Sequence, residues 1–362
     1  MIPVYEPLLG DQEKENVIKA LDSGWISSRG EFIDAFESQF SAYTGIRNST
    51  TCSNGTTALH LALLALEIGP GDEVILPDLT YIATANAVRF VGATPVLCDI
   101  DSSTWQIDVK KINDLITIKT KAIIVVHLYG GASDLLSINK IAKSANLHVI
   151  EDCAESLGTF YNGRHVGYSD ISTFSFFGNK TITTGEGGMV CSNNSDVIKL
   201  VNKYKNQGVI EQGSFNHDII GYNYRMTNIA ASIGLAQLSK ISYILDKKCT
   251  LFNLYKKYLS STRIFWQKNI PESINSYWMV TIGCESPSIR NNLRKYLRSF
   301  KIDTRPGFIP ISKQGPYLYL NTNNHISNTI GDTIINLPSY PGLTENQIKY
   351  ICDCILNFYR NQ

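Results

Sequence analysis

The segment FSFFGNKTITTGEGGM (174–189) places Lys180 between aromatic residues and a run of glycines. A lysine in a partly buried, aromatic-lined loop has a lowered pKa, and its neutral amine can attack an aldehyde to form a Schiff base. Ser175 carries a hydroxyl that could donate to a phosphate on the same ligand. The other interpretation is a solvated lysine in a surface loop, and this segment alone does not decide between them.

Asp152 ends the apolar run LHVIED (147–152). Ligands in open α/β sheets bind outside the carboxyl ends of the strands, and a carboxylate there could hold a protonated ring nitrogen. Aspartates at strand ends are also common as turn or helix-capping residues. On its own, Asp152 favours that structural interpretation.

The segment TCSNGTTALHLALLAL (51–66) opens an apolar helix with small polar residues and Gly55. A helix that starts in this way presents bare backbone N–H groups and suits a phosphate. The same residues, Asn54 to Thr57, would also make a good helix cap without a ligand. The segment lacks the lysine of a GxxxxGK[ST] loop, and the chain has no GxGxxG dinucleotide motif beside it.

Taken together, these residues match the needs of one cofactor. Pyridoxal phosphate requires an anion cradle for its phosphate, a carboxylate for its ring nitrogen and a lysine for its aldehyde. The chain supplies the cradle at Gly55 and Thr56, then Asp152, then Ser175 and Lys180. The order of the pieces therefore indicates a pyridoxal phosphate site.

The elements that would position these residues alternate along the chain. Strand-like runs are continuously apolar rather than alternating, with helical patterns between them, which is typical of a mostly parallel sheet covered by helices on both faces. We predict helices at 58–66 and 135–146 and strands at 73–77, 95–100, 122–130 and 147–154.

The pattern changes after about residue 240. A lysine-rich helical stretch (241–259) leads into short strand-like segments and a last helical pattern (345–360). We therefore predict an α/β protein with a large cofactor-binding domain at 1–240 and a smaller α+β domain at 241–362.

Composition excludes several classes of protein. With 43% hydrophobic and 18% charged residues and a net charge of +1, the chain is not disordered and has no field to recruit nucleic acid or a membrane surface. The first residues do not resemble a signal peptide, and no apolar stretch is long enough for a membrane span. The eight cysteines and six histidines show no metal-binding spacing. We expect a cytoplasmic protein with reduced thiols and no metal.

The motifs resemble the DegT/DnrJ/EryC1/StrS family of sugar aminotransferases over nearly the whole chain. The segments that carry the resemblance include SNGTTALHLAL (53–63), PDLTYIATANAV (77–88), EDCAESLG (151–158), SFFGNKTITTGEGGM (175–189) and GYNYRMTNIAASIGL (221–235). The resemblance implies a fold-type I aminotransferase that uses pyridoxal phosphate. FFGNKTITTGEGGM and IDTRPGF (302–308) look most like the members that aminate C4 of GDP-4-keto-6-deoxymannose with glutamate, for bacterial O-antigen.

The resemblance also implies roles for single residues. Lys180 matches the lysine that binds the cofactor's aldehyde, and Asp152 matches the carboxylate on its ring nitrogen. Glu155 matches a polar contact to the phenolic oxygen, often Gln or His in relatives, and Tyr81 matches an aromatic residue that stacks on the ring. The phosphate contacts are Gly55, Thr56 and Ser175.

Three further residues concern the partner subunit and the substrate. Asn223 matches an asparagine that reaches the phosphate from the neighbouring subunit, which implies a homodimer with shared active sites. Arg225 and Arg305 match candidates for binding the nucleotide diphosphate of the substrate.

Glu186 has only a structural explanation, as part of a tight glycine turn.

The chain departs from many relatives at IPISKQGPY (309–317), where a PLHLQP-like segment with a histidine would help to shape the sugar site. This departure leaves the exact sugar open. Keto sugars linked to dTDP or UDP are the alternative substrates. A branch of this fold replaces the lysine with histidine and removes a hydroxyl, whereas Lys180 favours transamination. Alternatives from other classes are a lyase, which would need a mobile cysteine nucleophile, and a non-catalytic regulatory protein that binds the cofactor. We expect Cys153, beside Asp152, to be packed rather than catalytic.

Overall fold

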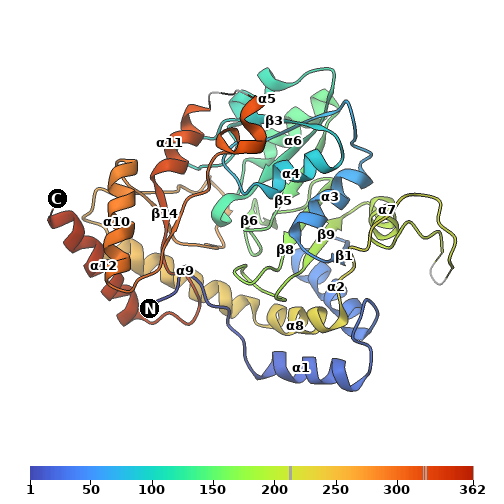
Figure 1. Cartoon of the computed structure of the whole chain (residues 1–362), viewed down its shortest axis with the longest axis horizontal. Coiled ribbons are helices and arrows are strands. Elements are labelled where there is room, and N and C mark those ends of the chain that lie inside the picture. Colours follow the sequence, from blue (N-terminus) through green and yellow to red (C-terminus); the bar gives the residue numbers. More distant parts are fainter. Residues whose placement is uncertain (212–213, 321, 323, 362) are drawn as a thin grey trace.

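A seven-stranded sheet forms the centre of the protein, whose computed structural model describes residues 1–362 apart from 212, 213, 321, 323 and 362 (Figure 1). All strands run parallel except β9, which is antiparallel to both of its neighbours. This confirms the predicted mostly parallel sheet. The strand order is β1 (Asn48–Cys52), β9 (Gly188–Ser192), β8 (Ile171–Ser175), β5 (His148–Asp152), β4 (Thr120–Val126), β2 (Glu73–Pro77) and β3 (Thr94–Cys98).

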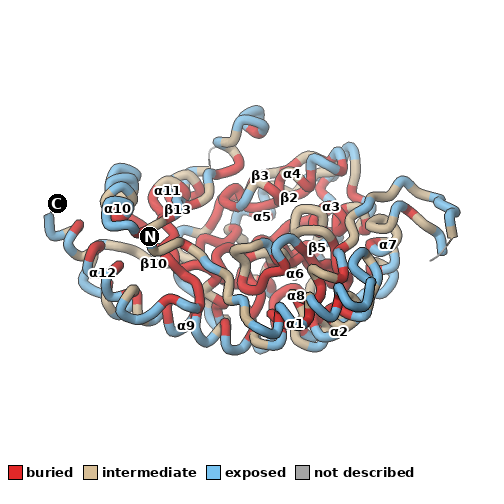
Figure 2. The backbone as a smooth tube through the Cα atoms, turned by 60° about the horizontal axis from the view of Figure 1, so that its bottom comes forward, coloured by how far each residue is buried: buried red, intermediate tan, exposed pale blue. Residues whose placement is uncertain are grey.

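Helices cover both faces of this sheet. Successive side chains of a strand point to opposite faces, so Ile123 and Val125 belong to one hydrophobic cluster and Ile124 and Val126 to the other. The buried strands lie between exposed outer helix surfaces (Figure 2). The first face packs against α2 (Glu31–Thr44), α5 (Val109–Leu115), α6 (Leu135–Ala145) and α8 (Asn228–Ser239), and the second against α3 (Gly55–Ala65), α4 (Ala83–Phe90) and α7 (Ser195–Lys205).

A second, antiparallel sheet lies in the C-terminal part of the chain. Its hydrophobic cluster includes residues of three helices, α9 (Ile241–Tyr258), α10 (Pro287–Ser299) and α12 (Glu345–Arg360). A small third sheet joins β11 (Ser273–Ile274), β6 (Phe160–Tyr161) and β7 (Arg164–His165). The second sheet has the order β10 (Phe265–Trp266), β12 (Thr281–Gly283), β14 (Ile334–Asn336) and β13 (Arg305–Pro306), and α11 (His325–Thr333) precedes β14.

Helix α9 links the two parts of the chain. It follows α8 at the seven-stranded sheet and runs beside α12 at the other end of the molecule (Figure 1). The boundary predicted at residue 240 falls between the end of α8 and the start of α9. That division of the chain stays a prediction.

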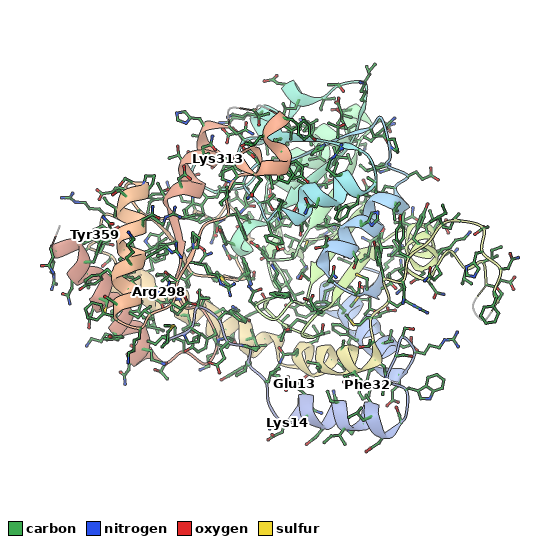
Figure 3. The ribbon with its side chains drawn as sticks, viewed as in Figure 1. Glu13, Lys14, Phe32, Arg298, Lys313 and Tyr359 are labelled. Atoms are coloured by element: carbon green, nitrogen blue, oxygen red, sulfur yellow. The ribbon has the colours of Figure 1, made fainter. Side chains whose placement is uncertain are left out.

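The first helix, α1 (Asp11–Asp22), is held against α8 by a buried carboxylate. Glu13 lies on the side of α1 that faces α8 (Figure 3), where it accepts a hydrogen bond of 2.6 Å from Gln237 and pairs with Lys240. Hydrogen bonds from Lys240, Gln237 and the Gly10 N–H outweigh burial and lower the pKa of Glu13. The ion pair therefore ties the N-terminal segment to the covered sheet.

The predicted strand at 122–130 is too long. Strand β4 ends at Val126, and a short turn (Leu128–Gly130) follows in which Tyr129 has a φ of 55°. The backbone leaves the sheet here because the Leu128 N–H bonds to the side chain of Gln106 instead of a neighbouring strand. No helix in the described part of the chain combines the length and hydrophobicity needed to cross a membrane.

Candidate active site

A cavity of about 470 Å³ opens beyond the carboxyl end of strand β5, where the N-terminus of α3 and the loop after β8 meet residues of the second sheet. Loop 275–280 and strands β13 and β14 close it from the C-terminal part of the chain. The structure brings most of the predicted site residues together in its lining. They are Gly55, Thr56, Tyr81, Asp152, Glu155, Ser175, Lys180 and Arg305.

Lys180 occupies a turn whose main chain is fixed from two sides. The Tyr5 hydroxyl donates to the Lys180 carbonyl (2.5 Å), and the Trp278 indole N–H donates to the Asn179 carbonyl (2.7 Å). The side chain is 14% exposed, and its Nζ lies 4.2 Å from the centre of the Trp278 ring. Lys180 is therefore not a solvated surface lysine.

Burial and the nearby carboxylates have opposite effects on the pKa of the Lys180 amine. Burial lowers its pKa, because the charged form loses hydration, while Glu155 and Asp152 raise it. The nearest carboxylate oxygen is Oε1 of Glu155, at 3.7 Å. On balance the pKa of Lys180 is lowered, so the neutral amine is more accessible than in water.

Asp152 is the last residue of β5 and is 5% exposed. Its carboxylate accepts hydrogen bonds from the Thr84 hydroxyl (2.9 Å) and the Ala154 N–H (3.1 Å). Burial raises its pKa, and these two hydrogen bonds and Lys180 only partly oppose the shift. A buried carboxylate of this kind gains from a cationic partner in the cavity.

Glu155 lies between Lys180 and the turn after β4. Its Oε2 accepts a hydrogen bond of 2.9 Å from the Tyr129 N–H, which the left-handed backbone of Tyr129 makes possible. Burial raises the pKa of Glu155 to about 7, and the opposing effect of Lys180 is smaller. The carboxyl group therefore titrates close to neutral pH.

The start of α3 forms an anion cradle. Asn54 caps the helix: its side chain accepts a hydrogen bond from the Thr57 N–H, and its carbonyl accepts one from the Ala58 N–H. The two N–H groups before them, of Gly55 and Thr56, start the helix and have no intrahelical acceptor. A side chain at Gly55 would bring its Cβ to 2.7 Å from the Cβ of Ser175. Glycine is thus required for the close approach of α3 to β8.

Tyr81 and Arg305 lie at the more open side of the cavity. The Tyr81 side chain is 58% exposed, and its ring centre is 5.8 Å from that of Phe308. Arg305 is on strand β13, which pairs with β14. Both side chains are accessible to a molecule that enters the cavity.

Asn223 and Arg225 do not line this cavity. They lie together, with the Arg225 Nε donating to the Asn223 side-chain oxygen (2.9 Å). The segment 309–317 also stays outside the lining. Ser312 bonds to Asp78, and Lys313, labelled in Figure 3, forms an exposed ion pair with Asp332.

Sequence reasoning missed several cavity residues. Trp278 and Asn336 come from the second sheet's region, far from the motifs in sequence, and no local pattern marks them. Thr84 lies within the quoted segment 77–88 and could have been found as a hydroxyl on the helix beside Asp152. Glu186 lines the cavity, which its interpretation as a turn residue did not anticipate.

A buried group of His127, Glu151 and Cys153 has metal-ligand residue types, with ligand atoms within 4.8 Å of one another. The Ser133 N–H donates to His127 Nδ1, so the ring proton is on Nε2 and is donated to Glu151 (2.9 Å). Glu151 also accepts from the N–H groups of Gly167 and Ser169. These contacts satisfy the histidine and the carboxylate within the protein.

The chain matches the DegT/DnrJ/EryC1/StrS aminotransferase family over residues 7–356. GDP-perosamine synthase of Escherichia coli O157:H7 is 48% identical over 362 residues, covering 100% of this chain and 99% of that protein. GDP-perosamine synthase of Vibrio cholerae is 43% identical over 364 residues, covering 99% of both. A solved structure of Spr1654 from Streptococcus pneumoniae in its PLP form, described as a putative sugar aminotransferase, is 28% identical with a TM-score of 0.94, covering 99% of both chains.

Replacing Glu155 by glutamine tests the electrostatics of the cavity. The folded-state pKa is raised from 4.5 to about 7, so the unfolded chain releases this proton first and the parent protein loses stability as pH rises through that window. We expect Glu155→Gln to stabilise the ligand-free protein at pH 8 by up to about 3 kcal/mol, with the gain vanishing near pH 4.5.

Urea unfolding at pH 5 and pH 8 measures this difference. Glu186→Gln is the matched control, because it removes an exposed carboxylate from the same cavity. If the free energy of unfolding of Glu155→Gln equals that of the parent at both pH values, the raised pKa of Glu155 is contradicted.

Proposed function

Because this chain belongs to the DegT/DnrJ/EryC1/StrS aminotransferase family, we propose that it transfers an amino group from glutamate to C4 of GDP-4-keto-6-deoxymannose, giving GDP-perosamine. The observation that carries this proposal is the full-length identity with two GDP-perosamine synthases. The cavity supports it, since a lysine and two carboxylates meet there at the end of a parallel strand.

The enzyme uses pyridoxal phosphate, and the cavity fits that group. The close packing of Gly55 against Ser175 leaves backbone N–H groups of α3 for the phosphate. In the described part of the chain, the buried Asp152 accepts hydrogen bonds from the neutral Thr84 hydroxyl and Ala154 N–H, and its carboxylate suits a protonated ring nitrogen. The side-chain oxygen of Asn179, buried without a hydrogen-bond partner among the described residues, offers a further polar contact at the cavity wall.

When bound, pyridoxal phosphate supplies an electron-accepting ring that makes the Cα proton of the amino donor removable. Lys180 Nζ takes up that proton and returns it during each half of the reaction, acting as general base and then general acid. Asp152 would hold the protonated ring nitrogen, Glu155 would offer a polar contact to the phenolic oxygen, and Tyr81 would offer an aromatic ring to the cofactor.

The substrate and the second subunit complete the site in this proposal. Arg305 lies in the cavity wall and suits a phosphate of the nucleotide. Asn223 and its neighbour Arg225 lie outside the subunit's own cavity, which agrees with a role in the active site of a partner subunit. We therefore propose a homodimer with shared sites.

The cysteine-dependent lyase is not favoured by the structure. Cys153 is 1% exposed, and burial raises its pKa well above the usual value, so the thiolate needed for attack is suppressed. The alternative substrates are dTDP- and UDP-linked keto sugars, which differ from the GDP sugar in the base that the site must recognise.

The Lys180→Ala variant tests the central residue. We expect a folded protein that loses turnover and the absorbance of the lysine-bound cofactor, because no other group can take over its proton transfer. Visible absorbance and product formation measure the effect, and Lys199→Ala on the surface of α7 is the control. Normal turnover in Lys180→Ala would refute the assignment.

Subunit mixing tests the shared sites. Lys180→Ala and Asn223→Ala should each be impaired, and exchange of their subunits should restore about a quarter of the parent activity, since half of the dimers are mixed and each has one intact site. If Asn223 serves its own subunit, mixed dimers will gain no activity.

A panel of nucleotide ketosugars tests the substrate. With glutamate as donor, we expect kcat/KM for GDP-4-keto-6-deoxymannose to exceed that for dTDP- and UDP-linked keto sugars by at least about 100-fold, because base recognition depends on buried polar contacts. Amination of a dTDP or UDP sugar alone would overturn the GDP assignment and leave the aminotransferase activity intact.

A further inference from the structure

Lys248 is a buried lysine that the proposed reaction does not use. It lies in the middle of α9 and is only 1% exposed. No carboxylate among the described residues forms an ion pair with it. A buried ammonium without a counter-ion is costly, so its contacts need a physical explanation.

The amine of Lys248 contacts two main-chain carbonyls and one aromatic ring. Its Nζ donates to the carbonyl of Trp278 (3.0 Å) and to that of Ser339 (3.2 Å). It also lies 5.1 Å from the centre of the Tyr5 ring. The Ser339 N–H in turn donates to the carbonyl of Val4, next to Tyr5 (3.0 Å). Lys248 thus joins the N-terminal segment to the loop before β12.

The two aromatic residues at Lys248 are the same two that hold the main chain at Lys180. Tyr5 donates its hydroxyl to the Lys180 carbonyl, and Trp278 donates its indole N–H to the Asn179 carbonyl. The Trp278 ring also lies against the Lys180 amine, 4.2 Å from ring centre to Nζ. Both supports of Lys180 therefore meet at a single buried amine.

We propose that Lys248 is a positioning residue for Lys180, acting through Tyr5 and Trp278 as their common anchor. The inference rests on the proposed role of Lys180 in proton transfer. An apolar side chain at this position could fill the space but could not donate to the two carbonyls, which would leave them unsatisfied. Small displacements of a reacting group are sufficient to slow an enzyme markedly.

The surroundings of Lys248 explain how an amine can occupy this place. Burial lowers its pKa to about 7, and a neutral amine still keeps two N–H donors for the two carbonyls. A second contact from α9, the Tyr255 hydroxyl to the Pro338 carbonyl (3.0 Å), holds the same segment independently. Loss of the Lys248 amine therefore need not detach the segment from α9.

The Lys248→Met variant of the holoenzyme tests the proposal, with Lys247→Met, at the neighbouring exposed position of α9, as the matched control. We expect kcat to fall about 10-fold while KM for the ketosugar stays within about twofold, because the sugar contacts are intact and the proton-transfer geometry is not. The absorbance of the Lys180-bound cofactor should titrate with a midpoint shifted by at least about half a pH unit. The Lys247→Met control should match the parent in kcat, in KM for the ketosugar and in the titration midpoint.

A double-mutant cycle identifies the route. Tyr5→Phe removes only the hydroxyl that reaches Lys180, so its effect and that of Lys248→Met on kcat should be less than additive. Additive effects, or a Lys248→Met protein with parental kcat and titration midpoint, would overturn the proposal.

Two further measurements keep the outcome decisive. If Lys248→Met fails to fold, Tyr5→Phe and Trp278→Phe answer the question, because parental kcat and midpoints in both would show that Lys180 does not depend on these supports. The Lys180→Ala variant tests the role of Lys180 in proton transfer separately from the positioning role of Lys248. If Lys180→Ala is inactive and Lys248→Met behaves as the parent, only the positioning role of Lys248 fails.

Discussion

The contact between the largely buried Lys180 amine and Glu155 carboxylate, 3.7 Å apart, is the interaction on which the site depends. Burial favours the neutral form of the lysine, and a nearby carboxylate favours the charged form. The structure combines both effects, and the lowered pKa of Lys180 shows that burial is the larger. Such a balance persists only if the distance is fixed, which the hydrogen bonds to the Asn179 and Lys180 carbonyls provide.

The fold supplies these distances from remote parts of the chain. The parallel sheet brings the end of β5, with Asp152, beside the end of β8, with Ser175. Helix α3 then approaches β8 because Gly55 has no side chain. The remaining wall comes from the second sheet, so the cavity needs both sheets. Helix α9 carries Lys248 and links the two, which makes it part of the support of the site rather than a spacer.

The sequence predicts what is encoded locally. A continuous apolar run locates β2, and helical patterns locate α6 and α12 closely. The residues of the motifs at 53–63, 151–158 and 175–189 meet in the cavity. Tyr5, Trp278 and Lys248 could not be predicted, because their importance arises only when segments far apart in the chain are packed together. The end of β4 was missed for a related reason, since the Gln106 side chain takes the place of a strand partner. Lys248 lies on the same stripe of α9 as Ile244 and Leu251, so the sequence could place it toward the core but could not show which carbonyls it contacts.

The pKa values of Glu155 and Lys180 also explain why Lys180 is buried rather than solvated. In water, the pKa values of a glutamate and a lysine differ by about 6 units, and such a pair stays locked as an ion pair at neutral pH. Here burial raises the pKa of Glu155 to about 7 and lowers that of Lys180, so the two values approach each other. A change in the surrounding charge, such as the arrival of an anionic or cationic group, therefore shifts the proton more easily than it would between the same two groups in water. An amine that must bind and release a proton in one catalytic cycle benefits when its pKa lies closer to that of its carboxylate partner. A solvated lysine would keep its ordinary pKa and would not have this property.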